Sequence, residues 1–180
     1  MKGKHILFIG TVQPRKNLVR LIKAFSGLRA KGQVLSRTKL VICGKLGWNF
    51  QEVLDEASKN KNVIVTGYVS DAERDSLLQH ALVYVQPSIT EGFGLPILEA
   101  MRAGVPVLSS NGGALKEVVG NAGLLFDPYD LSDLSDKLVK VLSNPKLRKS
   151  LIALGHLRVR DFSWEKATRQ TYNVLTKFEI

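Results

Sequence analysis

Short apolar runs alternate with stretches of helical periodicity along the whole chain. Most of these runs are aliphatic or β-branched and show no alternation with polar residues. Such runs are typical of strands that are covered on both faces of a parallel sheet. We therefore predict strands over residues 6–10, 40–43, 63–66, 82–86, 105–109 and 123–126.

The intervals between these runs predict helices with recognisable ends. Asn17 is expected to cap the first helix, because apolar residues recur at helical spacing directly after it. Ser70 and Glu73 form a capping-box pattern. Pro96 fits the first turn of a helix, and Ser163 is expected to cap the last one. The predicted helices cover residues 18–28, 51–60, 71–80, 96–103, 114–119, 131–142, 146–160 and about 163–178.

Alternating strands and helices predict an α/β fold. Right-handed βαβ units would give a doubly wound, Rossmann-like parallel sheet of about six strands, flanked by helices. The 180 residues fit one domain, 1–180. The first strand begins within a few residues of Met1, so we expect no leader and little room for a linker.

Composition supports a globular domain of the cytoplasm. Hydrophobic residues make up 44% of the chain and charged residues 23%, close to globular averages. The single cysteine, Cys43, cannot form an internal disulfide, which favours a reducing compartment. No apolar run is long enough to span a bilayer.

The formal charge of +10 admits a nucleic-acid-binding function as a competing hypothesis. That function predicts steeply salt-dependent binding of oligonucleotides. However, the basic residues are spread over most predicted helices, and no interleaving of aromatic and basic residues is seen. A small anionic ligand is therefore the better expectation, and we expect no nucleic-acid partner.

The segment from Glu91 to Glu99 is the best candidate for a binding site. Two carboxylates flank a Gly-x-Gly turn, and Pro96 opens a helix before the second acid. Backbone N–H groups at a helix start can hold a diphosphate, while carboxylates accept hydrogen bonds from sugar hydroxyls. Together they describe a pocket for a sugar nucleotide.

Each acid also has a plainer interpretation. Glu91 could be a solvated loop acid. Glu99 could form a surface ion pair with Arg102, three residues later on the same helix. We expect Glu99 to lie away from the apolar stripe of its helix, on a face with Ala100 and Ala103 that lets a ligand pack closely.

Other loops fall at the carboxyl ends of the predicted strands, where ligands collect in open α/β sheets. The first carries Arg15 and Lys16, which could reach a phosphate, although taken alone they read as exposed cations. Glycines after the second, third and fifth strands taken singly predict turns.

Several other chemistries lack their sequence signals. The three histidines are far apart, and no Cys/His cluster has the spacing of metal ligands. The chain has no Walker phosphate loop, no Gly-x-Ser-x-Gly elbow and no Gly-x-Gly-x-x-Gly turn. It also has no Asp-x-Asp. We therefore expect no metal ion and no cofactor, the nucleotide-sugar being a substrate.

With these residues assembled, the chain resembles the C-terminal, donor-binding domain of the family 4 (group 1) retaining glycosyltransferases of the GT-B fold. The likeness runs nearly end to end. It rests on the Glu-x7-Glu spacing inside Glu-Gly-Phe-Gly-Leu-Pro, and on the motifs 8–11, 14–17, 63–67, 103–106, 122–128 and 162–165.

The resemblance implies a divided site for a UDP- or GDP-linked sugar. It assigns the diphosphate to Arg15, Lys16 and the amides of Gly94 and Leu95. It assigns ribose binding to Glu99 and base binding to the backbone of Gly67, Tyr68 and Val69. Glu91 would be the catalytic residue and would meet the donor sugar with Gly92, Phe93 and Gly94, orienting it or stabilising charge without acting as a nucleophile. Thr11 stands where many relatives carry an arginine, so diphosphate binding is expected to depend more on Lys16.

The resemblance also implies a second, N-terminal acceptor-binding half that is absent from this sequence. The final helix, about 163–178, is expected to pack toward that half, and the isolated domain should bind the donor but transfer a hexosyl group poorly. The full-length enzyme could touch the inner face of the membrane peripherally. The alternative is a non-catalytic nucleotide-sugar-binding subunit that works with a separate acceptor-binding partner.

Overall fold

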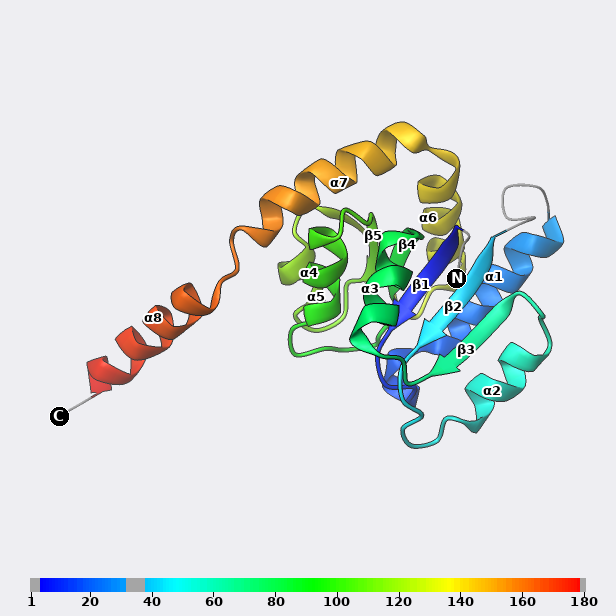
Figure 1. The fold of residues 1–180 in the computed structure, drawn as a ribbon, viewed down its shortest axis with the longest axis horizontal. Coiled ribbons are helices and arrows are strands. Elements are labelled where there is room, and N and C mark those ends of the chain that lie inside the picture. Colours follow the sequence, from blue (N-terminus) through cyan, green and yellow to red (C-terminus); the bar gives the residue numbers. More distant parts are fainter. Residues whose placement is uncertain (1–3, 32–37, 179–180) are drawn as a thin grey trace.

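A computed structural model describes residues 4–31 and 38–178, and its centre is one six-stranded parallel sheet (Figure 1). The strand order is β3-β2-β1-β4-β5-β6. The order reverses between β1 and β4, which is the switch point where doubly wound folds bind ligands. The strands are β1 (His5–Ile9), β2 (Lys39–Cys43), β3 (Val63–Gly67), β4 (Ala81–Gln86), β5 (Val107–Ser110) and β6 (Gly123–Phe126).

Helices cover both faces of the sheet (Figure 1). They are α1 (Leu18–Lys31), α2 (Gln51–Ser58), α3 (Asp71–Gln79), α4 (Leu95–Arg102), α5 (Leu115–Val119), α6 (Leu131–Ser143), α7 (Pro145–Val159) and α8 (Trp164–Leu175), with short 3-10 turns at Pro14–Lys16 and Thr176–Phe178. The predicted fold class is therefore confirmed.

The core has two layers, one on each side of the sheet. In β1, Ile6 and Phe8 pack with α1, α2 and α6, whereas Leu7 and Ile9 pack with α3, α4 and α5. Alternate residues of a strand point to opposite faces, so a strand covered on both faces is mostly apolar. All five residues of β1 are accordingly buried.

Most element ends lie within a few residues of the prediction, and β5 differs for a clear reason. It begins at Val107 instead of residue 105. The Val105 amide donates to the Ala100 carbonyl of α4, and Pro106 has no amide to donate to a neighbouring strand. These two residues therefore finish the turn that follows α4.

The helix caps were partly predicted. Ser70 and Glu73 form the expected capping box, and the Ser163 hydroxyl accepts from the Lys166 amide. Asn17 directly precedes α1, and its carbonyl accepts from the Leu21 amide, but the side-chain cap expected of it is not formed: its backbone is left-handed, at φ 56°, and it also ends the Pro14–Lys16 turn. Its side-chain amide instead donates to the Pro87 and Pro128 carbonyls, so it ties three loops together.

Helix α8 stands apart from the body of the domain (Figure 1). None of its residues is buried, and Trp164 at its start is 80% exposed. Tyr172, Val174 and Leu175 are also exposed. No helix in the described residues is long and apolar enough to cross a membrane.

Candidate functional site

The loops that follow β1 and β4 meet at the switch point of the sheet. The Ile89 amide donates to the Arg15 carbonyl over 2.8 Å, and the Arg15 guanidinium donates to the Thr90 carbonyl over 3.0 Å. Because β1 and β4 are neighbours in the sheet, their carboxyl ends bring these loops together. The site is therefore built at the place where the topology predicts one.

Glu91 lies at this junction, and its side chain is only 9% exposed. Nη1 of Arg15 donates to Oε2 of Glu91 over 2.6 Å, and Nζ of Lys16 donates to Oε1. The interpretation of Glu91 as a solvated loop acid is thus excluded. The structure brings Arg15, Lys16 and Glu91 together, which sequence reasoning had assigned to adjoining parts of one site.

A chain of hydrogen-bonded, buried polar side chains ends at the Glu91 carboxylate. Ser88 donates to Oε1 of Glu91 over 2.7 Å, and the Gln86 amide donates to the same oxygen over 3.2 Å and to the Ser88 hydroxyl over 2.8 Å. The Tyr84 hydroxyl donates to the Gln86 side-chain oxygen. Sequence analysis missed these residues. The signal was present, since a glutamine ends an otherwise apolar buried strand, and such a polar group needs a partner.

The surroundings of Glu91 keep it ionised. Burial raises its pKa, but hydrogen bonds from Lys16, Arg15 and Ser88, together with the Lys16 charge, outweigh that effect and hold the pKa below the usual value. A carboxylate of this kind can stabilise positive charge or orient a hydroxyl, but it is a poor proton donor near neutral pH.

The loop between β5 and α5 presses against the Glu91 loop from the other side. A Cβ on Gly112 would lie 2.0 Å from the Ile89 carbonyl oxygen, and one on Gly113 would lie 2.5 Å from the Glu91 carbonyl oxygen. The Ala114 amide donates to that Glu91 carbonyl over 3.0 Å. These glycines are therefore required for the backbones to approach, which goes beyond the turn-making role predicted for them.

The start of α4 offers free amides beside Glu91. Gly94 precedes the helix with a left-handed backbone, at φ 95°, and Pro96 lies in the first turn. The Ile97 amide bonds to the Gly94 carbonyl, but the Phe93, Gly94 and Leu95 amides have no acceptor in the part of the chain that the structure describes. Unpaired amides at a helix start attract anions.

Glu99 occupies a different environment, one turn into α4. Its side chain is 39% exposed, and Oε1 lies 3.7 Å from Nη1 of Arg74 on α3. The alternative pairing with Arg102 is not formed. Ala100 is fully buried in the core, so the expectation that it lines an open face with Glu99 is wrong.

Both acids nevertheless act on one buried group. The pKa of Tyr84 is raised well above its usual range, first by burial and then by the negative charges of Glu91 and Glu99. Tyr84 therefore keeps its proton and donates it to the Gln86 side-chain oxygen.

The residues predicted for the base lie at the end of β3, beside these elements. Gly67 has φ 71°, and its carbonyl accepts from the Gly44 amide over 2.9 Å. Tyr68 is 71% exposed, with the Lys45 ammonium 5.2 Å from its ring centre. Val69 packs at the edge of the core. These three residues thus follow the edge strand of the sheet, which pairs with β2.

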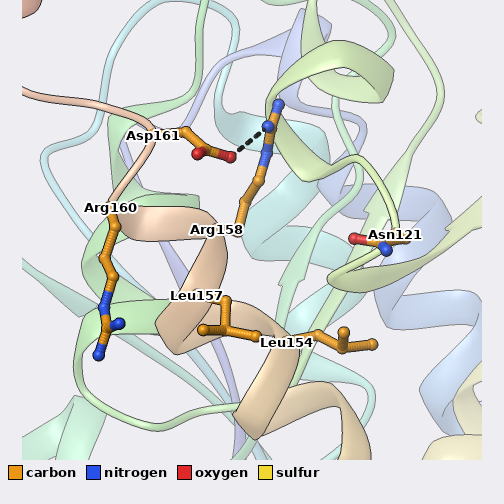
Figure 2. Close-up of a pocket in the computed structure, with 6 residues that line it drawn as sticks. All are labelled: Asn121, Leu154, Leu157, Arg158, Arg160 and Asp161. Carbon is orange, nitrogen blue, oxygen red and sulfur yellow. Dashed lines mark hydrogen bonds and ion pairs between the residues drawn. The ribbon is translucent and has the colours of Figure 1, made fainter.

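The segment before α8 reaches back to the Glu91–Glu99 loop. The rings of Phe93 and Phe162 meet edge to face, with their centroids 5.6 Å apart. The Arg158 guanidinium lies 4.8 Å from the centre of the Phe162 ring and donates to the Val118 and Glu117 carbonyls at the end of α5. Figure 2 shows Arg158 turned toward Asp161, with which it forms an ion pair of 2.8 Å.

An open pocket of about 400 Å³ lies beside the Arg158–Asp161 ion pair (Figure 2). Its lining is Asn121, Leu154, Leu157, Arg158, Arg160 and Asp161. None of these residues belongs to the predicted site. The Arg158 charge is already matched by Asp161 and two carbonyl oxygens, so the pocket shows no free buried charge for a ligand.

Comparison with known proteins shows which family the chain belongs to. Residues 1–157 match the family model of the group 1 glycosyl transferases. The chain is 38% identical over 172 residues to O-antigen chain mannosyltransferase B of Escherichia coli, which covers 94% of this chain and 45% of that protein. It is 32% identical over 176 residues to the phosphatidyl-myo-inositol mannosyltransferase of Mycobacterium leprae, covering 96% of this chain and 46% of that protein.

A solved structure shows the same fold. The sucrose-phosphate synthase of Thermosynechococcus elongatus superposes with a TM-score of 0.82 at 24% identity, over 98% of this chain and 45% of that one. The chain thus spans less than half the length of the relatives named here. The sequence match and the Rossmann-like sheet together show that this chain belongs to the group 1 glycosyltransferases, which have the GT-B fold.

Proposed function

We propose that this chain is the donor-binding domain of a retaining, metal-independent glycosyltransferase that uses a nucleotide diphosphate sugar. The observation that carries the proposal is the set of unpaired amides at Phe93, Gly94 and Leu95, in the loop whose Glu91 carboxylate pairs with the ammonium group of Lys16. An amide cradle with a cation beside it suits a diphosphate that has no divalent metal to neutralise it.

Lys16 is suited to hold that diphosphate while it stays paired with Glu91. Its side chain is 12% exposed, and only one of its three ammonium donors is needed for the Glu91 carboxylate. Arg15 is 43% exposed and can turn toward solvent. The leaving phosphate would thus meet positive charge as its bond to the sugar breaks.

Glu91 is proposed to act on the sugar end of the donor, together with the backbone of Gly92, Phe93 and Gly94. Because it remains ionised, it is suited to orient a sugar hydroxyl or to stabilise the positive charge that develops at the anomeric carbon. Retention of configuration would then depend on the leaving phosphate as the group that accepts the proton of the incoming hydroxyl.

The names of the relatives suggest a mannosyl group as the sugar. Two of them are described as mannosyltransferases, and each is more than twice as long as the segment matched here. We therefore propose that the acceptor is bound by residues outside this chain, and that the chain alone transfers sugar poorly. Helix α8, with its exposed apolar residues, is the element proposed to contact that acceptor-binding part.

Calorimetric titration of the chain with GDP, UDP and their sugar derivatives tests the proposal. We expect at least one nucleotide diphosphate to bind, and Lys16→Ala to weaken that diphosphate about tenfold while the bare nucleoside binds as before, because a charged hydrogen bond is lost. Lys59→Ala is the matched control, since its ammonium pairs with Glu56 on α2, away from the proposed site. Absence of any binding, or equal losses for diphosphate and nucleoside, would refute the phosphate site.

The second candidate is a non-catalytic nucleotide-sugar-binding subunit, favoured by the uncovered apolar side chains of α8. Acceptor-dependent sugar transfer by the lone chain would exclude this candidate. Release of a product only after a second protein is added would support it.

A further inference from the structure

Gln86 ends β4 at the switch point of the sheet and is almost completely buried. Its side chain is 1% exposed, and it directly follows the fully buried Tyr84 and Val85. A buried amide group destabilises a protein unless its polar atoms are hydrogen-bonded. Those of Gln86 are: the oxygen accepts from the Tyr84 hydroxyl, and the nitrogen donates to Ser88 over 2.8 Å and to Glu91 over 3.2 Å.

The hydrogen bonds of this network all run in one direction, toward Glu91. An ionised carboxylate only accepts hydrogen bonds, so the Gln86 amide must turn its nitrogen to Glu91 and its oxygen to Tyr84. The Tyr84 hydroxyl holds that orientation, because it donates to the Gln86 oxygen. The Ser88 hydroxyl accepts from Gln86 and donates its own proton to Glu91 over 2.7 Å. Tyr84 thus determines which end of the amide faces the carboxylate.

The two oxygens of the Glu91 carboxylate are held unequally. Oε1 accepts from Lys16, Ser88 and Gln86, whose side chains are at most 12% exposed. Oε2 accepts from Arg15, whose side chain is 43% exposed. A carboxylate has about two lone pairs on each oxygen, so Oε1 has no accepting capacity left, whereas Oε2 keeps some. A sugar hydroxyl that reaches Glu91 would therefore find its acceptor in Oε2.

We propose that Gln86 is a positioning residue: held by Tyr84, it anchors Oε1 of Glu91 so that Oε2 is presented to the donor sugar. This inference rests on the proposed function, because it takes from there the assignment of Glu91 to the sugar. In this role Gln86 touches no substrate itself and acts through the orientation of the carboxylate. Such preorganised hydrogen bonds keep a charged group in place, so that it need not rearrange when the ligand arrives.

The competing explanation is that Gln86 only stabilises the end of β4. The two roles differ in their effect on ligands. A residue that merely holds the strand affects a nucleotide diphosphate and its sugar derivative equally, because the same loops bind both. A residue that orients Glu91 affects the sugar derivative and spares the diphosphate, which lacks the group that Glu91 is proposed to meet.

The test is calorimetric titration of the wild-type chain and of Gln86→Met with GDP, GDP-mannose, UDP and UDP-glucose. Methionine is close to glutamine in length and volume but lacks the amide donors. Gln86→Met should weaken the sugar derivative roughly tenfold and the diphosphate by less than about twofold, because a hydrogen bond to a charged group is lost. Gln51→Met is the matched control and should change neither, since the Gln51 amide donates to Asp55 within α2.

Tyr84→Phe removes only the hydroxyl that orients the amide. It should weaken the sugar derivative about threefold in the wild-type background, because the amide is then free to turn. In the Gln86→Met background it should have no further effect, because Tyr84 acts through Gln86. If Gln86→Met does not fold, as judged by circular dichroism, the single substitution Tyr84→Phe decides between the two roles.

Several outcomes would overturn the positioning role and leave the diphosphate site standing. They are equal losses for a diphosphate and its sugar derivative, no loss for the sugar derivative, an additive effect of Tyr84→Phe in the double variant, and a wild-type chain that binds GDP or UDP but neither sugar derivative. If the wild-type chain binds no nucleotide diphosphate, the proposed function fails together with this inference.

Discussion

The two carboxylates of the segment between β4 and α4, Glu91 and Glu99, have nearly opposite surroundings. Glu91 is 9% exposed and receives hydrogen bonds from Arg15, Lys16, Gln86 and Ser88. Glu99 is 39% exposed, and its one ion-pair partner in the described residues lies 3.7 Å away. One carboxylate is held by the protein in advance, while the other is left open.

The difference shows how one short segment can combine rigidity with recognition. A preorganised carboxylate keeps its charge and position without waiting for a ligand, as electrostatic stabilisation requires. A half-exposed carboxylate instead keeps lone pairs free for incoming hydroxyl groups. The protein therefore fixes the acid proposed to meet the sugar and leaves open the acid proposed to bind the ribose.

The largest expected effect comes from breaking the support of the Glu91 loop. Gly112→Ala would place a Cβ 2.0 Å from the Ile89 carbonyl oxygen, so the two loops must separate. We expect a loss of about 3 kcal/mol in the free energy of unfolding, measured by urea denaturation. The control is Gly27→Ala in α1, where an added Cβ would meet nothing within 4 Å. This substitution should be neutral or stabilising. Equal effects of the two substitutions would show that the close approach does not matter.

A middle-sized effect is expected from neutralising the two acids in turn. Glu91→Gln removes the charge that partners Lys16 and Arg15 and should lower the free energy of unfolding by about 2 kcal/mol. Glu99→Gln should change it by less than about 0.5 kcal/mol, because its ion pair is long and partly exposed. Urea denaturation of both variants at neutral pH measures the contrast. A larger loss in Glu99→Gln would show that Glu99, and not Glu91, is the more firmly held acid.

The smallest effect is a pH dependence that belongs to Glu91. Its pKa in the folded state lies below the ordinary value of 4.5, so its contribution to stability is complete above that value. The contribution disappears as the pH falls through the lower, folded-state pKa, because only the unfolded chain has bound the proton before that point. The wild type should therefore lose stability faster than Glu91→Gln between about pH 5 and pH 3, by less than about 1.4 kcal/mol per pH unit. Parallel curves for the two proteins would contradict the depressed pKa.

Much of the fold could be predicted because local patterns and tertiary structure agree in this chain. A strand such as β1 is apolar on both faces, and only burial on both faces explains that composition. The caps at Ser70 and Ser163 are likewise local, because donor and acceptor lie three residues apart. Glu91 and Glu99 were found because their spacing around Pro96 is unusual for a surface helix.

The failures involve contacts between distant parts of the sequence. Asn17 has the residue type and the position of a helix cap, but its side-chain amide donates to carbonyls 70 and 111 residues away, and its Oδ1 accepts from the Arg20 guanidinium instead of a backbone amide. Glu99 was expected to pair with Arg102 on its own helix, whereas its neighbour is Arg74 on α3. Gln86 and Ser88 belong to the site only because β4 ends beside the loop after β1. A residue pattern read along one element does not contain this information.

The exposure of α8 gives the chain a spectroscopic property of its own. Trp164, at the first position of that helix, is 80% exposed, and the only other indole, Trp48, is 59% exposed. Both should therefore fluoresce at the long wavelengths of tryptophan in water. A protein that covers α8 would shift the emission of Trp164 to the blue and shield it from iodide, so the helix proposed to join the acceptor-binding part also carries a label that reports the joining.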